Sequence, residues 1–175
     1  AKAVFDEQLR FQRQHRKLLP EAIRFGAMLE VPALGEVLDL LMPKLSFLSV
    51  GTNDLTQFLF AADRANPKLA ERYDWLSPAI LRFLRRISQT VVGQGVDLAV
   101  CGEMGGRRLE ALALMGIGYR RLSITPAAVG PIKELVRKVD LAEITEAMNG
   151  WLAVPPPDLR AALSHWASER GIDHD

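Results

Sequence analysis

The sequence predicts an α/β fold made of about four consecutive strand–helix units, roughly half of a (β/α)8 barrel. Two observations lead to this prediction. Short apolar runs alternate with segments of helical periodicity between residues 24 and 140. No hairpin signal joins two neighbouring strands, so the strands should run parallel with helical crossovers. A closed barrel needs eight such units and about 250 residues, whereas this chain has 175.

The first elements follow from apolar spacing. Residues 2 to 19 predict a helix that Pro20 ends, and the lack of a convincing cap favours a chain cut from a longer one. Residues 25 to 31 predict a short buried strand that Pro32 stops. Residues 34 to 41 then predict a helix, because their apolar positions recur as on one helical face.

The later elements continue the alternation. Ser77 and Pro78 predict a helix start, since serine can cap and proline is preset for the first turn. That helix should bury one face, made of Ile80, Leu81, Leu84, Ile87 and Val91. The other predicted elements are a strand at 45–50, a helical start at 54–62, a strand at 96–101, a helix at 109–115, a strand at 121–124, a helix at 131–139 and two short helices within 141–170.

These elements suggest three regions. Residues 1–23 would be the leading helix of a truncated barrel, residues 24–140 the strand–helix units that carry the functional site, and residues 141–175 a C-terminal helical tail. A terminal support is a better interpretation of the last region than a second domain, because its helices are short and flank a proline-rich break at 155–157.

Composition limits the partners and the compartment. Lysine plus arginine (22) nearly balances aspartate plus glutamate (21), so no overall field favours nucleic acid or a membrane. The single cysteine, Cys101, excludes an intrachain disulfide framework and favours a reducing compartment. No apolar run approaches the roughly 20 residues that span a bilayer, and the start lacks a signal-peptide pattern. We therefore expect a cytoplasmic protein without nucleic-acid or membrane partners.

Three predicted strands end in polar groups that can do chemistry. Glu30 ends the first, Asn53 and Asp54 follow the second, and Cys101 ends the third. Side chains just past the carboxyl ends of parallel strands escape the packed core. Glu30 and Asp54 would repel each other unless a cation lay between them, and Mg²⁺ accepts such oxygen ligands. Alternatively, Asp54 and Gln57 form a capping-box variant and Glu30 pairs with an arginine.

Cys101 and Arg64 also have two interpretations each. The Cys101 thiol could act as an acid in a site, or it could fill space in the core as most lone cysteines do. The Arg64 guanidinium could bind phosphate oxygens as a bidentate fork, or it could form a surface ion pair with Asp63.

Four blocks of residues, in this order and at this spacing, resemble the phosphoenolpyruvate-binding barrel of the phosphoenolpyruvate-utilising enzymes. They are residues 28–33 (MLEVPA), 49–57 (SVGTNDLTQ), 62–66 (ADRAN) and 101–106 (CGEMGG). Residues 58–64 and 122–131 make the chain most similar to Enzyme I of the sugar phosphotransferase system, in particular the nitrogen-related Enzyme I. The resemblance covers about residues 24 to 170 and implies the C-terminal half of a TIM-type barrel.

The resemblance implies a role for each strand-end residue. Glu30 and Asp54 would bind Mg²⁺, Asn53, Asp54 and Arg64 would hold phosphoenolpyruvate, and Cys101 would be the proton donor that yields pyruvate. The phosphoryl group would pass to a histidine on a mobile N-terminal domain, then to a histidine phosphocarrier protein, in a homodimeric enzyme.

This sequence departs from the family pattern in extent. The mobile N-terminal domain and its histidine motif are not in this sequence. The earlier barrel strands, which bring further arginines in the family, are also missing, so we expect a fragment that is inactive alone. Two other interpretations stay open. The chain could be part of pyruvate phosphate dikinase or phosphoenolpyruvate synthase, or a non-catalytic module for dimerisation or regulation.

Overall fold

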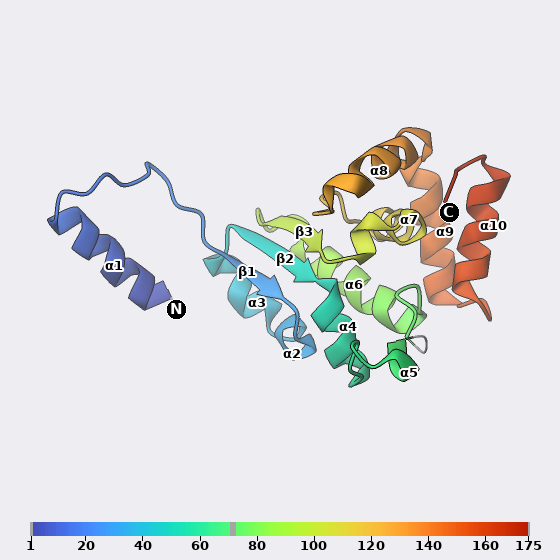
Figure 1. Cartoon of the computed structure of the whole chain (residues 1–175), viewed down its shortest axis with the longest axis horizontal. Coiled ribbons are helices and arrows are strands. Elements are labelled where there is room, and N and C mark those ends of the chain that lie inside the picture. Colours follow the sequence, from blue (N-terminus) through green and yellow to red (C-terminus); the bar gives the residue numbers. More distant parts are fainter. Residues whose placement is uncertain (1, 71–72, 175) are drawn as a thin grey trace.

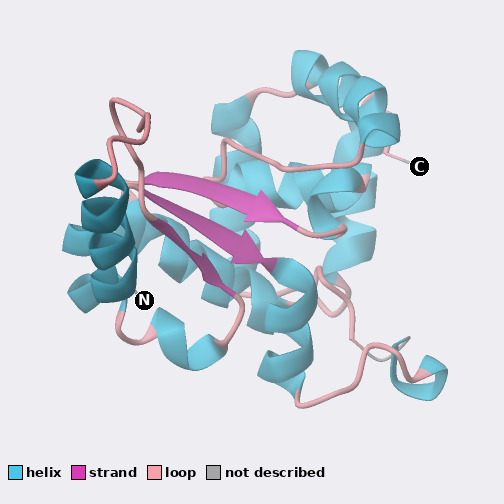
Figure 2. Cartoon of the chain, turned by 60° about the vertical axis from the view of Figure 1, so that its left-hand side comes forward, coloured by secondary structure: helices cyan, strands magenta, loops and turns pink. Residues whose placement is uncertain are grey.

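The computed structural model describes residues 2–70 and 73–174 and contains a three-stranded parallel sheet in the order β1-β2-β3 (Figures 1 and 2). The strands are β1 (Gly26–Leu29), β2 (Phe47–Gly51) and β3 (Asp97–Cys101). Each strand lies within its predicted apolar run or one residue beyond it. The predicted α/β class with a parallel sheet is therefore confirmed.

The two faces of the sheet differ. Leu48, Val50 and Val100 are buried in the hydrophobic core, as alternate residues of a strand that point to one face. The opposite face is open, because Met28 and Phe47 are 50% and 40% exposed. The register aligns Leu29 with Val50, and Gly51 with Cys101, so the strand ends meet along one edge.

The connections between the strands are helical. The predicted helix after Ser77 is α6 (Pro78–Val91), and its predicted apolar face is buried as expected. The other helices are α1 (Lys2–Gln14), α2 (Pro32–Gly35), α3 (Leu38–Leu41), η1 (Met42–Lys44), α4 (Thr52–Phe60), α5 (Pro67–Ala70), η2 (Met104–Gly106), α7 (Arg108–Gly116), α8 (Pro126–Lys138), α9 (Leu141–Ala153) and α10 (Leu159–Glu169).

The C-terminal helices pack around α7, whose residues from Leu109 to Gly116 are all buried. Gly116 allows α9 to approach closely, because a Cβ there would lie 2.5 Å from Met148 Cγ and 3.0 Å from the Ile144 carbonyl oxygen. By contrast, α1 lies apart from this body in Figure 1 and has no buried residue. Among the described helices, none combines the length and apolar character that a bilayer-spanning helix requires.

Several predicted elements differ from the structure. The fourth strand at 121–124 is wrong, because Leu122 forms only an isolated parallel bridge to Val100. The helix at 34–41 is split into α2 and α3, since Val37 between them leaves the helical region, with φ −122° and ψ 21°. The first helix ends at Gln14, five residues early, and Arg16 takes the left-handed region at φ 52°.

Candidate functional site

The three strand ends bring Glu30, Gly51 and Cys101 into one row. Leu29 pairs with Val50, which places Glu30 beside Gly51, and Gly51 pairs with Cys101. A Cβ at Gly51 would lie 3.2 Å from Glu30 Oε2 and 3.3 Å from Glu30 Cβ. Because glycine has no side chain there, the Glu30 carboxylate can lie over the end of β2.

Helix α4 begins immediately after β2, so Thr52, Asn53 and Asp54 form its first turn. Two side chains of this turn connect it to the neighbouring strand end. Thr52 Oγ1 donates a hydrogen bond to the Cys101 carbonyl oxygen at 3.0 Å, and Asn53 Oδ1 accepts one from the Glu103 N–H at 3.1 Å. Asn53 Nδ2 lies 3.5 Å from Glu103 Oε1. These contacts hold the segments that follow β2 and β3 together.

Gly102 makes this close approach possible. Its φ of 105° lies in the left-handed region, which L side chains rarely adopt. A Cβ at this position would also lie 2.6 Å from Thr52 Oγ1 and 2.9 Å from Asn53 Oδ1. The glycine after Cys101 therefore fits the chain against the first turn of α4.

Asp54 is paired with Arg64, not used as a helix cap. Arg64 Nη2 lies 3.3 Å from Asp54 Oδ1, and Gln57 Oε1 accepts a hydrogen bond from the Arg64 N–H at 3.2 Å. The capping-box interpretation is wrong, because α4 begins at Thr52 and already includes Asp54. The alternative ion pair between Arg64 and Asp63 is also not formed in the described residues, since Asp63 Oδ1 accepts from the Ala65 N–H.

The Cys101 thiol is half-buried and hydrogen-bonded. Ser49 Oγ donates to Cys101 Sγ at 3.1 Å, and Cys101 Sγ lies 3.6 Å from the Val50 carbonyl oxygen. These polar neighbours distinguish the thiol from a cysteine that only fills an apolar core. Cys101 lies in the row of strand ends and is only partly buried.

The oxygen donors at this edge are of the kind that a hard divalent cation accepts. Glu30 and Asp54 lie at neighbouring strand ends, and the alternative ion pair of Glu30 with an arginine is not seen in the described part of the chain. Residues 2–70 and 73–174 also hold no group of three or more His, Cys, Asp or Glu side chains that could enclose a metal. Mg²⁺ is usually held by one or two carboxylates with water and substrate phosphate oxygens, and this donor set fits that pattern.

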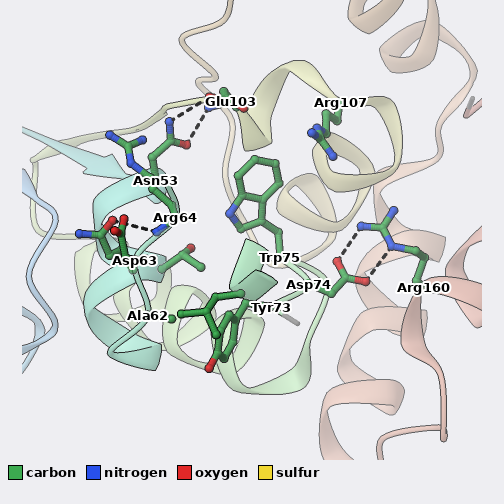
Figure 3. Close-up of a pocket in the computed structure, with 13 residues that line it drawn as sticks. Asn53, Ala62, Asp63, Arg64, Tyr73, Asp74, Trp75, Glu103, Arg107 and Arg160 are labelled. Atoms are coloured by element: carbon green, nitrogen blue, oxygen red, sulfur yellow. Dashed lines mark hydrogen bonds and ion pairs between the residues drawn. The ribbon is translucent and has the colours of Figure 1, made fainter. Parts of the chain in front are cut away.

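A cavity of about 440 Å³ opens beside the row of strand ends (Figure 3). Two of the predicted site residues, Asn53 and Arg64, line it, whereas Glu30, Asp54 and Cys101 do not. Sequence reasoning missed the far wall of the cavity, which comes from the segment before α6, the start of α7 and α10. Its lining residues there are Tyr73, Asp74, Trp75, Arg107 and Arg160. No local motif marks them, because residues such as Asp74 and Arg160 meet only in the folded chain.

An ion-pair network closes that far wall. Arg160 donates to Asp74 at 2.7 and 2.6 Å and to Glu110 at 2.6 Å, and Glu110 is buried. Burial opposes ionisation of Asp74, but hydrogen bonds from Arg160 and the Leu76 N–H and the charges of Arg160 and Arg107 outweigh it and lower the Asp74 pKa. The hydrogen bond to Asp74 raises the pKa of Arg160. This network ties α10 to α7 and to the cavity.

Comparison with known proteins gives one consistent result. Residues 1–141 match the family described as "PEP-utilising enzyme, PEP-binding domain". The chain is 42% identical over 129 residues to a phosphoenolpyruvate-protein phosphotransferase of Borreliella burgdorferi, covering 74% of this chain and 22% of that protein. It is 46% identical over 150 residues to the protein named "Phosphoenolpyruvate-dependent phosphotransferase system" of Escherichia coli, covering 85% of this chain and 20% of that protein. The chain therefore spans about a fifth of the length of these curated relatives.

Proposed function

We propose that this chain, which belongs to the family described as "PEP-utilising enzyme, PEP-binding domain", is the phosphoenolpyruvate-binding part of a phosphoenolpyruvate-protein phosphotransferase. The observation that carries this proposal is the row of strand ends, where a carboxylate, an amide with a second carboxylate, and a thiol meet along one edge. The names of the similar proteins support the reaction class.

Asn53, Asp54 and Arg64 would hold the substrate. The Arg64 guanidinium can donate two parallel hydrogen bonds to a phosphate or carboxylate group, and its backbone is held by Gln57. The Asn53 amide, positioned by Glu103, can donate to a further substrate oxygen. Both side chains line the cavity, so a bound anion would lie between them and the strand ends.

Glu30 and Asp54 would hold Mg²⁺. When bound, this cation would offset the negative charges of the substrate carboxylate and phosphate and of the enolate that phosphoryl loss leaves. The exposed Asp54–Arg64 contact, at 3.3 Å, is loose enough for both side chains to turn towards ligands at small cost.

Cys101 would deliver the proton that converts the enolate of phosphoenolpyruvate to pyruvate. The S–H bond would break as a C–H bond forms at the methylene carbon, and the thiolate left behind would accept the hydrogen bond from Ser49. The thiol lies in the same row as Glu30, so both could act on one substrate molecule.

The proposal extends to the architecture and partners of the full-length protein. The open face of the sheet, with Met28 and Phe47 exposed, is what one half of a TIM-type (β/α)8 barrel would direct towards the barrel interior. Residues 24–140 would supply the strand–helix units, between a leading helix at 1–23 and a helical tail at 141–175. The phosphoryl group would go to a histidine of a separate domain and then to a histidine phosphocarrier protein, in a cytoplasmic homodimer.

Calorimetry of phosphoenolpyruvate binding, with and without Mg²⁺, tests this proposal. We expect binding that requires the metal and is lost in Glu30→Ala and Asp54→Ala, whereas the matched variant Asp63→Ala, in the same segment, should still bind. The same titrations on the intact protein distinguish an incomplete pocket from a wrong assignment. If neither the chain nor the intact protein binds phosphoenolpyruvate, the proposed function is wrong.

A further inference from the structure

Arg107 lies beside the cavity and forms no ion pair in the described part of the chain. It precedes α7, its side chain is exposed, and its guanidinium carbon lies 4.8 Å from the centre of the Trp75 ring. Within the part of the chain that the structure describes, that guanidinium has no ion pair and no hydrogen bond. Figure 3 shows Arg107 across Trp75 from Asn53.

The other two arginines of the cavity wall are engaged. Arg64 lies 3.3 Å from Asp54. Arg160 binds both Asp74 and the buried Glu110. Neither guanidinium therefore brings a full uncompensated charge to the cavity, so Arg107 differs from both.

The carboxylates that line the cavity are also occupied. Asp63 accepts a hydrogen bond from the Ala65 N–H at 2.8 Å, and Glu103 lies 3.5 Å from the Asn53 amide nitrogen. Asp74 is bound by Arg160, although the charge of Arg107 also contributes to lowering its pKa. An anionic ligand could thus approach Arg107 without first breaking an ion pair.

Stacking on Trp75 prepares Arg107 for binding. A guanidinium on an aromatic face keeps its N–H groups free at the edge, in the planar fork that matches phosphate and carboxylate oxygens. The ring also restricts the rotamers of the long side chain, which reduces the entropy that binding must overcome. The cavity, at about 440 Å³, has the size of small-molecule sites.

We propose that Arg107, stacked on Trp75, is an additional anion-binding residue that contacts a phosphate or carboxylate group of the ligand in this cavity. The inference rests on the proposed function for the identity of the natural ligand, but the anion site itself is defined by the cavity and the free guanidinium. Sequence reasoning gave no sign of it, because Trp75 and Arg107 are far apart in the chain and lie in no shared motif.

Titration of the chain with inorganic phosphate, pyruvate and phosphoenolpyruvate, each followed by the Trp75 indole N–H signal in NMR, tests this site. Trp75→Phe identifies the signal. We expect Arg107→Gln to weaken the binding of phosphate, and of phosphoenolpyruvate with Mg²⁺, by at least about tenfold, because it removes a charged hydrogen-bond donor. Arg107→Lys should lose less anion affinity than Arg107→Gln. Arg137→Gln, which removes the same charge from the exposed surface of α8, should leave the anion affinities unchanged.

The outcomes separate this inference from the proposed function. Weakened phosphate binding in Arg107→Gln with pyruvate unchanged assigns the contact to phosphate, and the reverse assigns it to carboxylate. If phosphoenolpyruvate binds neither this chain nor the intact protein, but phosphate binding still depends on Arg107, the proposed function is wrong and the anion site remains. Equal affinities in the wild-type and Arg107→Gln chains, or no response of the Trp75 signal to any of the three anions, would overturn the inference.

Discussion

At Gly51 the end of β2 passes so close to Glu30 that an added Cβ would force the Glu30 side chain to shift. The strand alternation alone predicts that Glu30 and Gly51 lie at the same edge, but it does not predict their contact. The structure supplies the reason for glycine, since a Cβ would lie 3.2 Å from Glu30 Oε2. The position of the candidate metal-binding carboxylate thus depends on its neighbour.

Gly51→Ala should displace the Glu30 carboxylate without unfolding the protein. The added methyl group would lie closer to Glu30 than most Cβ atoms lie to their neighbours, so the Glu30 side chain must move. We therefore expect at least about a tenfold loss of Mg²⁺-dependent phosphoenolpyruvate affinity in calorimetry. Gly130→Ala is the control, because nothing lies within 4 Å of its Cβ and it is in α8. Gly130→Ala should keep the affinity and raise the free energy of unfolding by about 0.5–1 kcal/mol. Equal affinities in both variants would contradict the role of Gly51.

At the scale of single elements, the strands were predictable and several helix boundaries were not. Each strand is a short apolar run with turn signals beside it, and burial of one sheet face fixes it. The prediction of one helix at 34–41 was wrong because apolar spacing does not reveal that the backbone around Val37 leaves the helical region. The prediction of a strand at 121–124 was wrong because, in this run, the structure shows a β-bridge at Leu122 alone.

The same limit applies to the candidate site. Glu30, Asn53, Asp54 and Cys101 could be singled out from sequence because each stands at or just past the end of an apolar run. The cavity wall around Trp75 could not, since it depends on how α6, α7 and α10 pack together.

Ser77 shows how a sequence rule can fail at a helix start. Serine before Pro78 predicts a side-chain cap, but Ser77 Oγ makes no cap hydrogen bond and is a buried atom without a hydrogen-bond partner among the residues that the structure describes. Ser77→Ala should therefore leave the free energy of unfolding unchanged or slightly raised in urea titrations, because it removes an unsatisfied buried hydroxyl. Asp140→Ala provides the contrast, since Asp140 does cap α9 by accepting from the Ala142 and Glu143 N–H groups. Asp140→Ala should lower the free energy of unfolding by about 1 kcal/mol. A similar loss in Ser77→Ala would show that Ser77 caps α6.

At the scale of the whole molecule, the Arg160 network joins segments that are distant in sequence. Arg160 in α10 holds Asp74 before α6 and Glu110 in α7, and the Glu110 side chain is only 3% exposed. This arrangement connects the C-terminal helices to the wall of the candidate site. By contrast, α1 contributes no buried residue to the body of the protein.

Arg160→Met should lower the free energy of unfolding by about 3 kcal/mol, because it leaves the buried Glu110 carboxylate without its cation. Lys138→Met, which removes a cation from an exposed pair with Glu134, should cost less than about 1 kcal/mol. Urea unfolding of the three proteins at pH 7 measures both differences. Equal losses would show that the network contributes no more than a surface pair.

The same variants predict a pH dependence. The Asp74 pKa is below its ordinary value of 3.8 in the folded protein, so ionised Asp74 stabilises the fold above that pH. This stabilisation is lost as the pH falls through the lowered pKa. The difference between wild type and Arg160→Met should therefore become smaller once the pH is well below 3.8. A difference that grows on acidification would contradict this assignment.

Deuterium exchange into the methyl group of pyruvate tests the central claim most directly, because it requires the strand-end groups to act together and needs no phosphoryl acceptor. Pyruvate in D₂O with Mg²⁺ should exchange its methyl protons in the presence of the intact protein, as followed by proton NMR. Cys101→Ala should slow this exchange by about 100-fold or more, as expected for loss of a general acid–base group, and omission of Mg²⁺ or Glu30→Ala should also suppress it. Exchange that proceeds equally fast in Cys101→Ala would contradict the account, because the thiol at the end of β3 would then not be the proton donor.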